Sequence, residues 1–122
     1  MTASILTVDD SASLRMAIRI ALSGAGYAVT EASDGVEGLA KATAQRFDLI
    51  VTDLNMPNMD GLEMIRALRQ QPAQAGIPII FLTTESDDAM KAQAKAAGAT
   101  GWLVKPFQAE QLIRVAQKVL AR

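Results

Sequence analysis

Short apolar runs alternate with longer amphipathic stretches five times along the chain. The apolar runs lie near 4–9, 28–32, 48–52, 77–82 and 100–104 and have the length and composition of β-strands. The first, third and fourth runs are apolar almost throughout, which is typical of strands covered on both faces. Because right-handed crossovers return each strand to the same sheet, this alternation predicts a parallel sheet between two layers of helices.

A helix is predicted after each strand. The first ends at Gly24 and Gly26, and the second opens at Asp34 with Glu37 three residues later, a variant of the capping box. The third starts after Gly61, and the fourth covers about 87–97 and ends at Gly98. In three of the predicted helices, apolar residues recur at intervals of three or four, which places them on one face. They are Leu14, Ala17, Ile18, Ala21 and Leu22 in the first helix, Leu62, Ile65 and Leu68 in the third, and Leu112, Val115, Ala116, Val119 and Leu120 in the fifth.

Composition narrows the class of protein. The chain has 122 residues without a linker or repeat, so we expect one domain over 1–122. It contains no Cys and no His, which excludes thiol chemistry, disulfides, imidazole catalysis and zinc sites built on His. The net charge is −1 and charges of both signs are spread along the chain, so the sequence shows no basic cluster of the kind that binds nucleic acid. No run reaches membrane-spanning length and no signal peptide is evident, so we expect a cytoplasmic protein without membrane insertion.

The polar residues that could do chemistry follow the predicted strands. Asp9 and Asp10 end the first run, Asp53 the third, Thr83 the fourth and Lys105 the fifth. The carboxyl ends of parallel strands form one edge of the sheet, and open parallel sheets bind their ligands there. We therefore expect these five side chains to form a single site.

Nucleotide binding is the first alternative for such an edge. The pair Gly24 and Gly26 resembles part of a dinucleotide fingerprint, but it follows a helix instead of opening one. The first strand-to-helix turn carries Asp9 and Asp10, which would repel a nucleotide or flavin phosphate. Clustered carboxylates suit a hard divalent cation such as Mg²⁺, which relieves their mutual repulsion. The competing interpretation makes Asp10 the N-cap of the first helix and Asp9 a turn residue.

The order and spacing of Asp9-Asp10, Asp53, Thr83 and Lys105-Pro106-Phe107 resemble those of bacterial response-regulator receiver domains. The segment from Asp53 to Gly61 is especially similar to the stand-alone, chemotaxis-type (CheY-like) receivers. The resemblance covers the whole chain. It implies an α/β, three-layer, doubly wound (βα)5 flavodoxin-like fold whose five-stranded parallel sheet has the order 2-1-3-4-5.

The resemblance also implies roles for the residues at this edge. Asp53 matches the phosphoacceptor. Asp10 and Asp53 match the side-chain ligands of Mg²⁺, and Asp9 acts largely through a bound water. Asn55 matches the position whose main-chain carbonyl binds the metal.

Three further positions match the parts of the receiver that respond to phosphorylation. Lys105 pairs with the phosphoryl group, and the hydroxyl of Thr83 moves to meet it. Trp102 stands where these receivers carry a switch tyrosine, which swings inward and reshapes the face made by the fourth helix, the fifth strand and the fifth helix. An indole is larger than a phenol and its N–H needs a partner when buried, so we expect Trp102 to swing less fully or to stay partly inward.

The implied function is that of a phosphoacceptor signalling protein and not of a general enzyme. The carboxylate of Asp53 attacks phosphorus, while Mg²⁺, Lys105 and Thr83 balance the charge on the phosphoryl oxygens. The resemblance implies a CheA-like histidine kinase as phosphodonor and a downstream target protein or phosphatase as partner. We expect a monomer that binds no nucleic acid.

Three alternatives to a signalling receiver remain at this point. A phosphate sink or phosphorelay carrier would use the same residues without a dedicated target. A phosphatase with an Asp nucleophile usually needs a second acid two residues later, where this chain has Asn55. A flavin-binding electron carrier is disfavoured by the acidic first turn.

Overall fold

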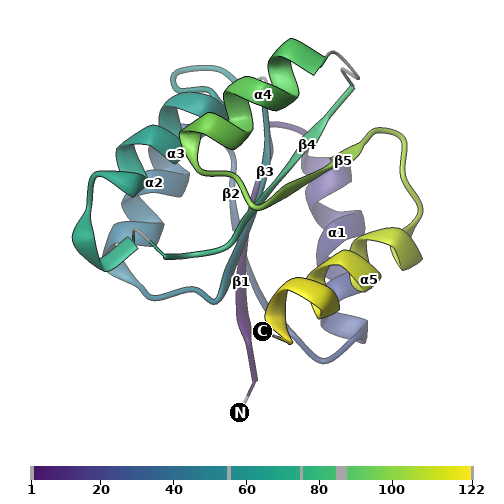
Figure 1. Ribbon diagram of the computed structural model, residues 1–122. Coiled ribbons are helices and arrows are strands. Elements are labelled where there is room, and N and C mark those ends of the chain that lie inside the picture. The colour runs from purple at the N-terminus through teal and green to yellow at the C-terminus, as the bar shows by residue number, and fades with distance from the viewer. Residues whose placement is uncertain (1, 55, 75, 85–87, 122) are drawn as a thin grey trace.

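The computed structural model describes residues 2–54, 56–74, 76–84 and 88–121. Within these ranges, five parallel strands form one sheet of order β2-β1-β3-β4-β5, the order that the resemblance to receiver domains implies (Figure 1). The strands are β1 Ser4–Val8, β2 Ala28–Ala32, β3 Leu49–Asp53, β4 Ile79–Thr83 and β5 Gly101–Val104. The helices are α1 Ala12–Gly24, α2 Gly35–Ala44, α3 Gly61–Arg69, α4 Asp88–Ala97 and α5 Ala109–Leu120, with a 3₁₀ turn, η1, at Pro72–Gln74.

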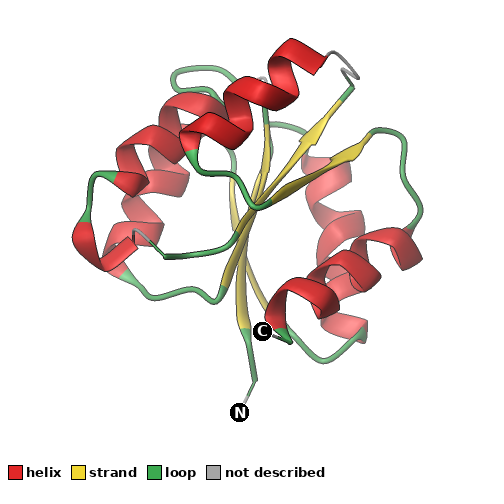
Figure 2. Cartoon of the chain, in the orientation of Figure 1, coloured by secondary structure: helices red, strands yellow, loops and turns green. Residues whose placement is uncertain are grey.

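The helices cover the two faces of the sheet unequally. Helices α1 and α5 lie on one face, and α2, α3 and α4 lie on the other (Figure 2). Side chains of β1 alternate between the layers: Leu6 and Val8 pack in the cluster that includes Met64 of α3, whereas Ile5 packs in the cluster that includes Leu112 of α5. This alternation is the pleat of a strand buried on both faces, and the predicted three-layer architecture is confirmed.

The element boundaries differ from the prediction by one or two residues. The first strand ends at Val8 instead of residue 9, and β4 begins at Ile79 instead of residue 77. Pro78 explains the later start of β4, because its carbonyl accepts from Ile50 but its ring nitrogen has no proton to donate to the sheet. The sequence analysis did not predict η1. The expected start of the fourth helix at 87 lies outside the described residues.

The start of α1 corrects one interpretation of the acidic turn. The N-cap is Ser11 and not Asp10, since the Oγ of Ser11 accepts a hydrogen bond from the main-chain N–H of Leu14 at 3.2 Å. A side-chain oxygen at this position satisfies one of the free N–H groups of the first helical turn. The carboxylate of Asp10 is therefore not committed to the helix.

The capping boxes also differ from expectation. At α2, Asp34 accepts from the N–H of Glu37 at 2.8 Å, but the Glu37 carboxylate accepts from the N–H of Ser33 instead of that of Asp34. The expected box is therefore only half formed. A complete reciprocal box occurs at α3, where Asp60 and Glu63 each accept from the other's N–H.

The backbone turns tightly after β3. The N–H of Gly61 donates to the carbonyl of Leu54 at 2.9 Å, and a Cβ on Gly61 would collide with the carbonyl of Asp53. Only a residue without a side chain allows α3 to start this close to the end of β3. The direction of the chain just after Asp53 is fixed by this contact.

None of the helices in the described ranges is long and apolar enough to cross a lipid bilayer.

Candidate functional site

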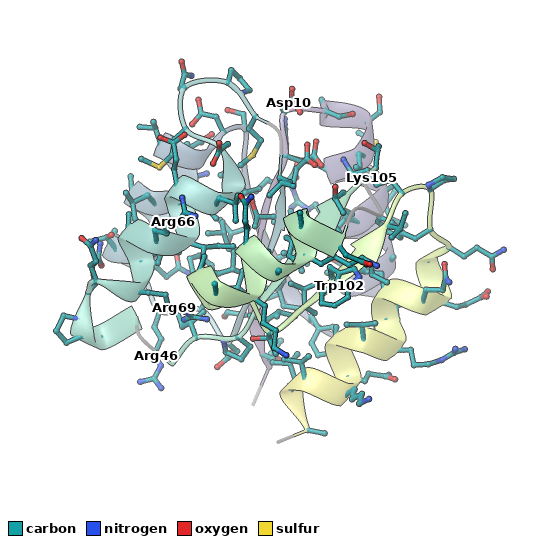
Figure 3. The ribbon with its side chains drawn as sticks, turned by 45° about the horizontal axis from the view of Figure 1, so that its top comes forward. Asp10, Arg46, Arg66, Arg69, Trp102 and Lys105 are labelled. Carbon is teal, nitrogen blue, oxygen red and sulfur yellow. The ribbon has the colours of Figure 1, made fainter. Side chains whose placement is uncertain are left out.

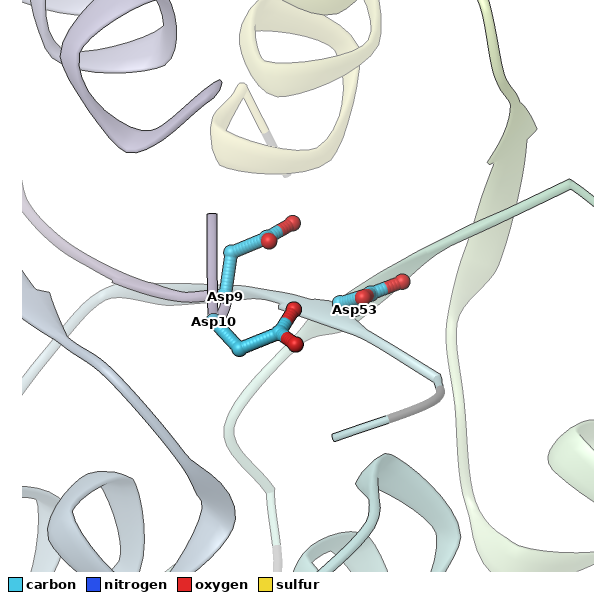
Figure 4. Close-up of side chains that lie close together, drawn as sticks. All are labelled: Asp9, Asp10 and Asp53. Atoms are coloured by element: carbon cyan, nitrogen blue, oxygen red, sulfur yellow. The ribbon is translucent and has the colours of Figure 1, made fainter. Parts of the chain in front are cut away.

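Three carboxylates converge where β1 and β3 end. The two strands are neighbours, with Val8 opposite Thr52, so Asp9 and Asp53 follow directly at the same edge. One carboxylate oxygen from each of Asp9, Asp10 and Asp53 lies within 4.8 Å of the other two (Figure 4). The structure thus brings together the acidic residues that the sequence placed at separate strand ends.

Asp53 is nearly buried, with 7% of its surface exposed. Its Oδ1 accepts hydrogen bonds from the N–H of Leu54 at 2.9 Å and lies 3.1 Å from the Nζ of Lys105. Burial raises the pKa of the Asp53 carboxyl above its ordinary value, the negative charge of Asp9 adds to this, and Lys105 opposes it. An added positive charge at this edge would stabilise the ionised form, which is the nucleophilic one.

Lys105 joins two of the carboxylates. Its Nζ lies 3.1 Å from Asp53 and 3.3 Å from the Oδ2 of Asp9, which is fully buried. Its main-chain N–H donates to the carbonyl of Thr83 at 2.7 Å, which extends the pairing of β4 and β5 by one residue. Lys105 therefore reaches the acidic cluster from a strand two positions away from β3, because β4 lies between them.

Asp10 is the exposed member of the cluster (Figure 3). Within the described ranges its carboxylate makes no hydrogen bond or ion pair, whereas the Oδ1 of Asp9 accepts from the N–H of Ser11 at 2.8 Å and its Oδ2 meets Lys105. Three carboxylate oxygens within 4.8 Å of one another, one of them on an exposed side chain, are a donor set suited to a hard divalent cation. The residues present fit Mg²⁺.

Thr83 ends β4 at the same edge and is almost fully buried, at 1% exposure. It pairs with Val104 of β5, and its main chain is tied to Lys105. The structure thus places the hydroxyl-bearing residue and the cation on neighbouring strands. Asn55, the expected source of a metal-binding carbonyl, lies outside the described residues.

Trp102, labelled in Figure 3, lies on β5, and its ring lies beside Lys91 of α4. Its side chain packs on Phe81 with the ring centroids 6.1 Å apart, and the ammonium of Lys91 lies 5.0 Å from its ring centroid. The residue is 39% exposed, which makes it more open to solvent than the inward position considered for it. Sequence reasoning missed Phe81 and Lys91. The aromatic side chain within the fourth apolar run could have indicated the first, but no pattern indicates the second.

A shallow apolar depression adjoins the site. It has a volume of about 350 Å³ and is lined by Leu14, Thr84, Lys105, Pro106 and Phe107. It lies beside the lysine that contacts Asp53, so a protein seated there would be next to the acidic cluster.

Comparison with known proteins identifies the family. Residues 5–117 match the family described as response regulator receiver domain, and the chain belongs to it. Receiver domains are signalling domains of two-component systems, which accept phosphoryl groups from histidine kinases.

The relatives include proteins of about the same length and a longer one. The chain is 49% identical to the Vibrio cholerae chemotaxis protein CheY4, whose structure matches with a TM-score of 0.94 over 98% of this chain and 100% of that one. It is 36% identical to the chemotaxis protein CheY of Pseudomonas aeruginosa, over 97% of this chain and 96% of that protein. It is 38% identical to the transcriptional regulatory protein ResD of Bacillus subtilis over 97% of this chain but 48% of ResD, so it spans about half of that relative.

Proposed function

We propose that residues 1–122 act as a single-domain, chemotaxis-type response regulator that accepts a phosphoryl group on Asp53. The observation that carries this proposal is the position of the Asp53 carboxylate, which is nearly buried, paired with Lys105 and grouped with Asp9 and Asp10. A carboxylate can act as a nucleophile toward phosphorus. The acyl phosphate formed on Asp53 would lie next to the ammonium of Lys105, which is already close to this carboxylate.

The residues of the chain supply most of what phosphoryl transfer needs. Oδ1 of Asp53 is held by Leu54 and Lys105, so the carboxylate is oriented before the donor arrives. The ammonium of Lys105 would balance charge on one phosphoryl oxygen, and the hydroxyl of Thr83 and nearby N–H groups would serve another. The bond from phosphorus to the donor breaks as the bond to Asp53 forms, and water later cleaves the acyl phosphate. Beyond these two steps on its own carboxylate, we propose no enzymatic activity.

Asp10 and Asp53 would hold Mg²⁺, with Asp9 acting largely through water and Asn55 offering its carbonyl. When bound, the ion neutralises charge on the phosphoryl oxygens and on the crowded carboxylates. The exposed carboxylate of Asp10 and the buried, lysine-paired one of Asp9 support this division of roles.

The output would pass through the face made by α4, β5 and α5. Lys105 would pull on the end of β5, and Thr83 would move toward the phosphoryl group on the neighbouring strand. Trp102, which is partly exposed and already packs on Phe81, would move farther inward, although less fully than a tyrosine would. A phosphoryl group can shift the equilibrium between the unphosphorylated and phosphorylated conformations only through contacts that differ between them. Lys105 and Thr83 would make those contacts.

The relatives support a proposal for the partners and the location. Identities of 49% to CheY4 and 36% to CheY over nearly full length support a CheA-like histidine kinase as donor, and a target protein or phosphatase that recognises the phosphorylated form. We propose a cytoplasmic monomer that binds no nucleic acid. The runner-up is a phosphate sink or relay carrier, which would have the same chemistry without a target.

Labelling with a radioactive small phosphodonor, acetyl phosphate, in the presence of Mg²⁺ tests the proposal. The parent protein should incorporate label and Asp53→Asn should not, because the amide keeps the shape but is no nucleophile. Asp48→Asn is the matched control. Asp48 lies next to the other end of β3, where its carboxylate accepts from the N–H of Ser4, so this variant should label normally. Full labelling of Asp53→Asn would refute the proposal.

A pull-down from cell extract with and without beryllofluoride separates signalling from a sink. A partner retained only in the presence of this phosphoryl mimic and Mg²⁺ supports a signalling output. Absence of any such partner, with rapid transfer to a histidine-containing domain, supports the relay carrier.

A further inference from the structure

The guanidinium of Arg15 is attached to the main chain of the acidic cluster. Its Nη1 donates a hydrogen bond to the carbonyl oxygen of Asp9 at 2.5 Å, and its Nε lies 3.2 Å from the carboxylate of Glu31 on β2. Its side chain is only 17% exposed, although Arg15 belongs to the surface helix α1. The charge of Arg15 is therefore directed at the strand end that carries Asp9 and Asp10.

Glu31 anchors this contact from the neighbouring strand. It is opposite Thr7 in the sheet, two residues before Asp9, and its second carboxylate oxygen lies 2.9 Å from Arg19. The planar guanidinium of Arg15 thus has one edge on a carboxylate that is itself held in place and one donor on a carbonyl. Such a fork is more rigid than a single contact from an ammonium group.

The carbonyl that Arg15 holds belongs to the planar peptide group that links Asp9 to Asp10. On the other side of Asp9, its N–H donates to the carbonyl of Ala32 at 3.1 Å. Both peptide groups of Asp9 are therefore fixed. The direction in which the side chain of Asp10 leaves the main chain depends on the peptide group between Asp9 and Asp10, which is the one that Arg15 holds.

Asp10 depends on its backbone more than the other carboxylates do. Asp9 and Asp53 are held by Lys105, and each also accepts a main-chain N–H, whereas the carboxylate of Asp10 has no partner within the described ranges. A metal ligand that no neighbour orients must be placed by the peptide that carries it. Partners of this kind, which hold a ligand without touching the ion, commonly change metal affinity by about 10- to 100-fold.

We propose that Arg15 is a positioning residue for the divalent cation: by holding the Asp9–Asp10 peptide, it presents Asp10 to the ion. This deepens the proposed function and rests on its metal site. Without the guanidinium, the carbonyl of Asp9 loses this donor, and the peptide that carries Asp10 is held less firmly.

The affinity for Mn²⁺, measured from the free-ion signal in electron paramagnetic resonance and checked by competition with Mg²⁺, tests the proposal. Arg15→Ala should weaken binding about tenfold. Arg19→Ala is the matched control, because Arg19 lies one helical turn away and pairs with the same Glu31 without touching Asp9. It should weaken binding far less than Arg15→Ala does, because Arg15 keeps its contacts with both Glu31 and the Asp9 carbonyl. Arg15→Lys, which can offer a single donor to the carbonyl, should fall between Arg15→Ala and the parent.

The outcomes separate this inference from the proposed function. If the parent binds neither Mn²⁺ nor Mg²⁺, the metal part of the proposed function fails. If the parent binds and Arg15→Ala binds equally well, the positioning role is overturned. Thermal unfolding of the parent and the variants in excess chelator measures how much stability each substitution costs in the absence of metal. If Arg15→Ala does not fold, the Mn²⁺ affinity of Arg15→Lys is compared with that of Arg19→Lys. Equal affinities of these two variants would overturn the inference.

Discussion

Removing the ammonium of Lys91 should make the proposed switch easier to operate. The Nζ of Lys91 lies 5.0 Å from the ring centroid of Trp102, over an indole that remains 39% exposed. This cation–π contact can form only while Trp102 occupies its present place beside α4. It therefore stabilises the starting state of the switch and not the state in which the indole has moved inward.

The expected size of the effect follows from the exposure of the pair. A cation–π contact at a site open to water contributes about 0.5–1 kcal/mol, because solvent screens it. Loss of that amount from the starting state shifts a two-state equilibrium about two- to fivefold toward the other state. The apparent affinity for beryllofluoride should therefore tighten about two- to fivefold in Lys91→Ala, since less free energy is spent on the conformational change.

Fluorescence measures this directly, because Trp102 is the only Trp in the chain. Beryllofluoride would be titrated into the parent and Lys91→Ala at a fixed, saturating Mg²⁺ concentration, with emission and quenching by acrylamide recorded at each step. Before the mimic is added, the variant should already show part of the change in emission that the parent shows at saturation.

Lys95→Ala provides the control. Lys95 lies on the same helix one turn later and has the same charge, but the cation over the indole is Lys91. A general effect of charge near the phosphoryl site would change both variants alike. Equal titrations for parent and Lys91→Ala, or equal shifts for Lys91→Ala and Lys95→Ala, would refute the idea that this contact holds the starting state.

Three further changes have expected results. Asp53→Asn should raise the melting temperature at neutral pH, because burial raises the pKa of this carboxyl and its ionised form costs stability. In the parent, the free energy of unfolding should fall as the pH rises from the ordinary pKa of an aspartate through the raised pKa of Asp53. The difference in melting temperature between the parent and the variant should therefore disappear at lower pH. Asp10→Ala should weaken Mg²⁺ binding, measured by calorimetry, and unchanged affinity would contradict its role as ligand. Gly61→Ala should lower the free energy of unfolding in urea by about 1–3 kcal/mol, because its Cβ collides with the carbonyl of Asp53.

The sheet and the five residues at its edge could be predicted because each signal is local. An apolar run followed at once by Asp53, or by Asp9 and Asp10, indicates a buried strand that ends in a polar loop. Parallel topology then places such ends at one edge, whatever the exact register. The competing interpretation, in which Asp10 caps the first helix, was wrong: two neighbouring residues can both cap, and Ser11 makes the bond.

The contacts of Arg15, Lys91 and Trp102 could not be predicted in the same way. Arg15 meets the Asp9 carbonyl only because Glu31, on another strand, holds the other edge of its guanidinium. The exposure of Trp102 depends on how α4 lies against β5, which is a matter of packing between elements and leaves no periodic trace in the sequence. Long, flexible side chains acquire their partners from the tertiary structure.

The most direct test of the central proposal is to locate the phosphoryl group chemically. The parent protein would be phosphorylated with acetyl phosphate and Mg²⁺, reduced with borohydride to convert the acyl phosphate to an alcohol, digested and sequenced by mass spectrometry. The modification should lie on Asp53 alone. Modification of Asp9 or Asp10 in its place, or phosphate on a hydroxyl such as that of Thr83, would contradict the assignment of Asp53 as phosphoacceptor.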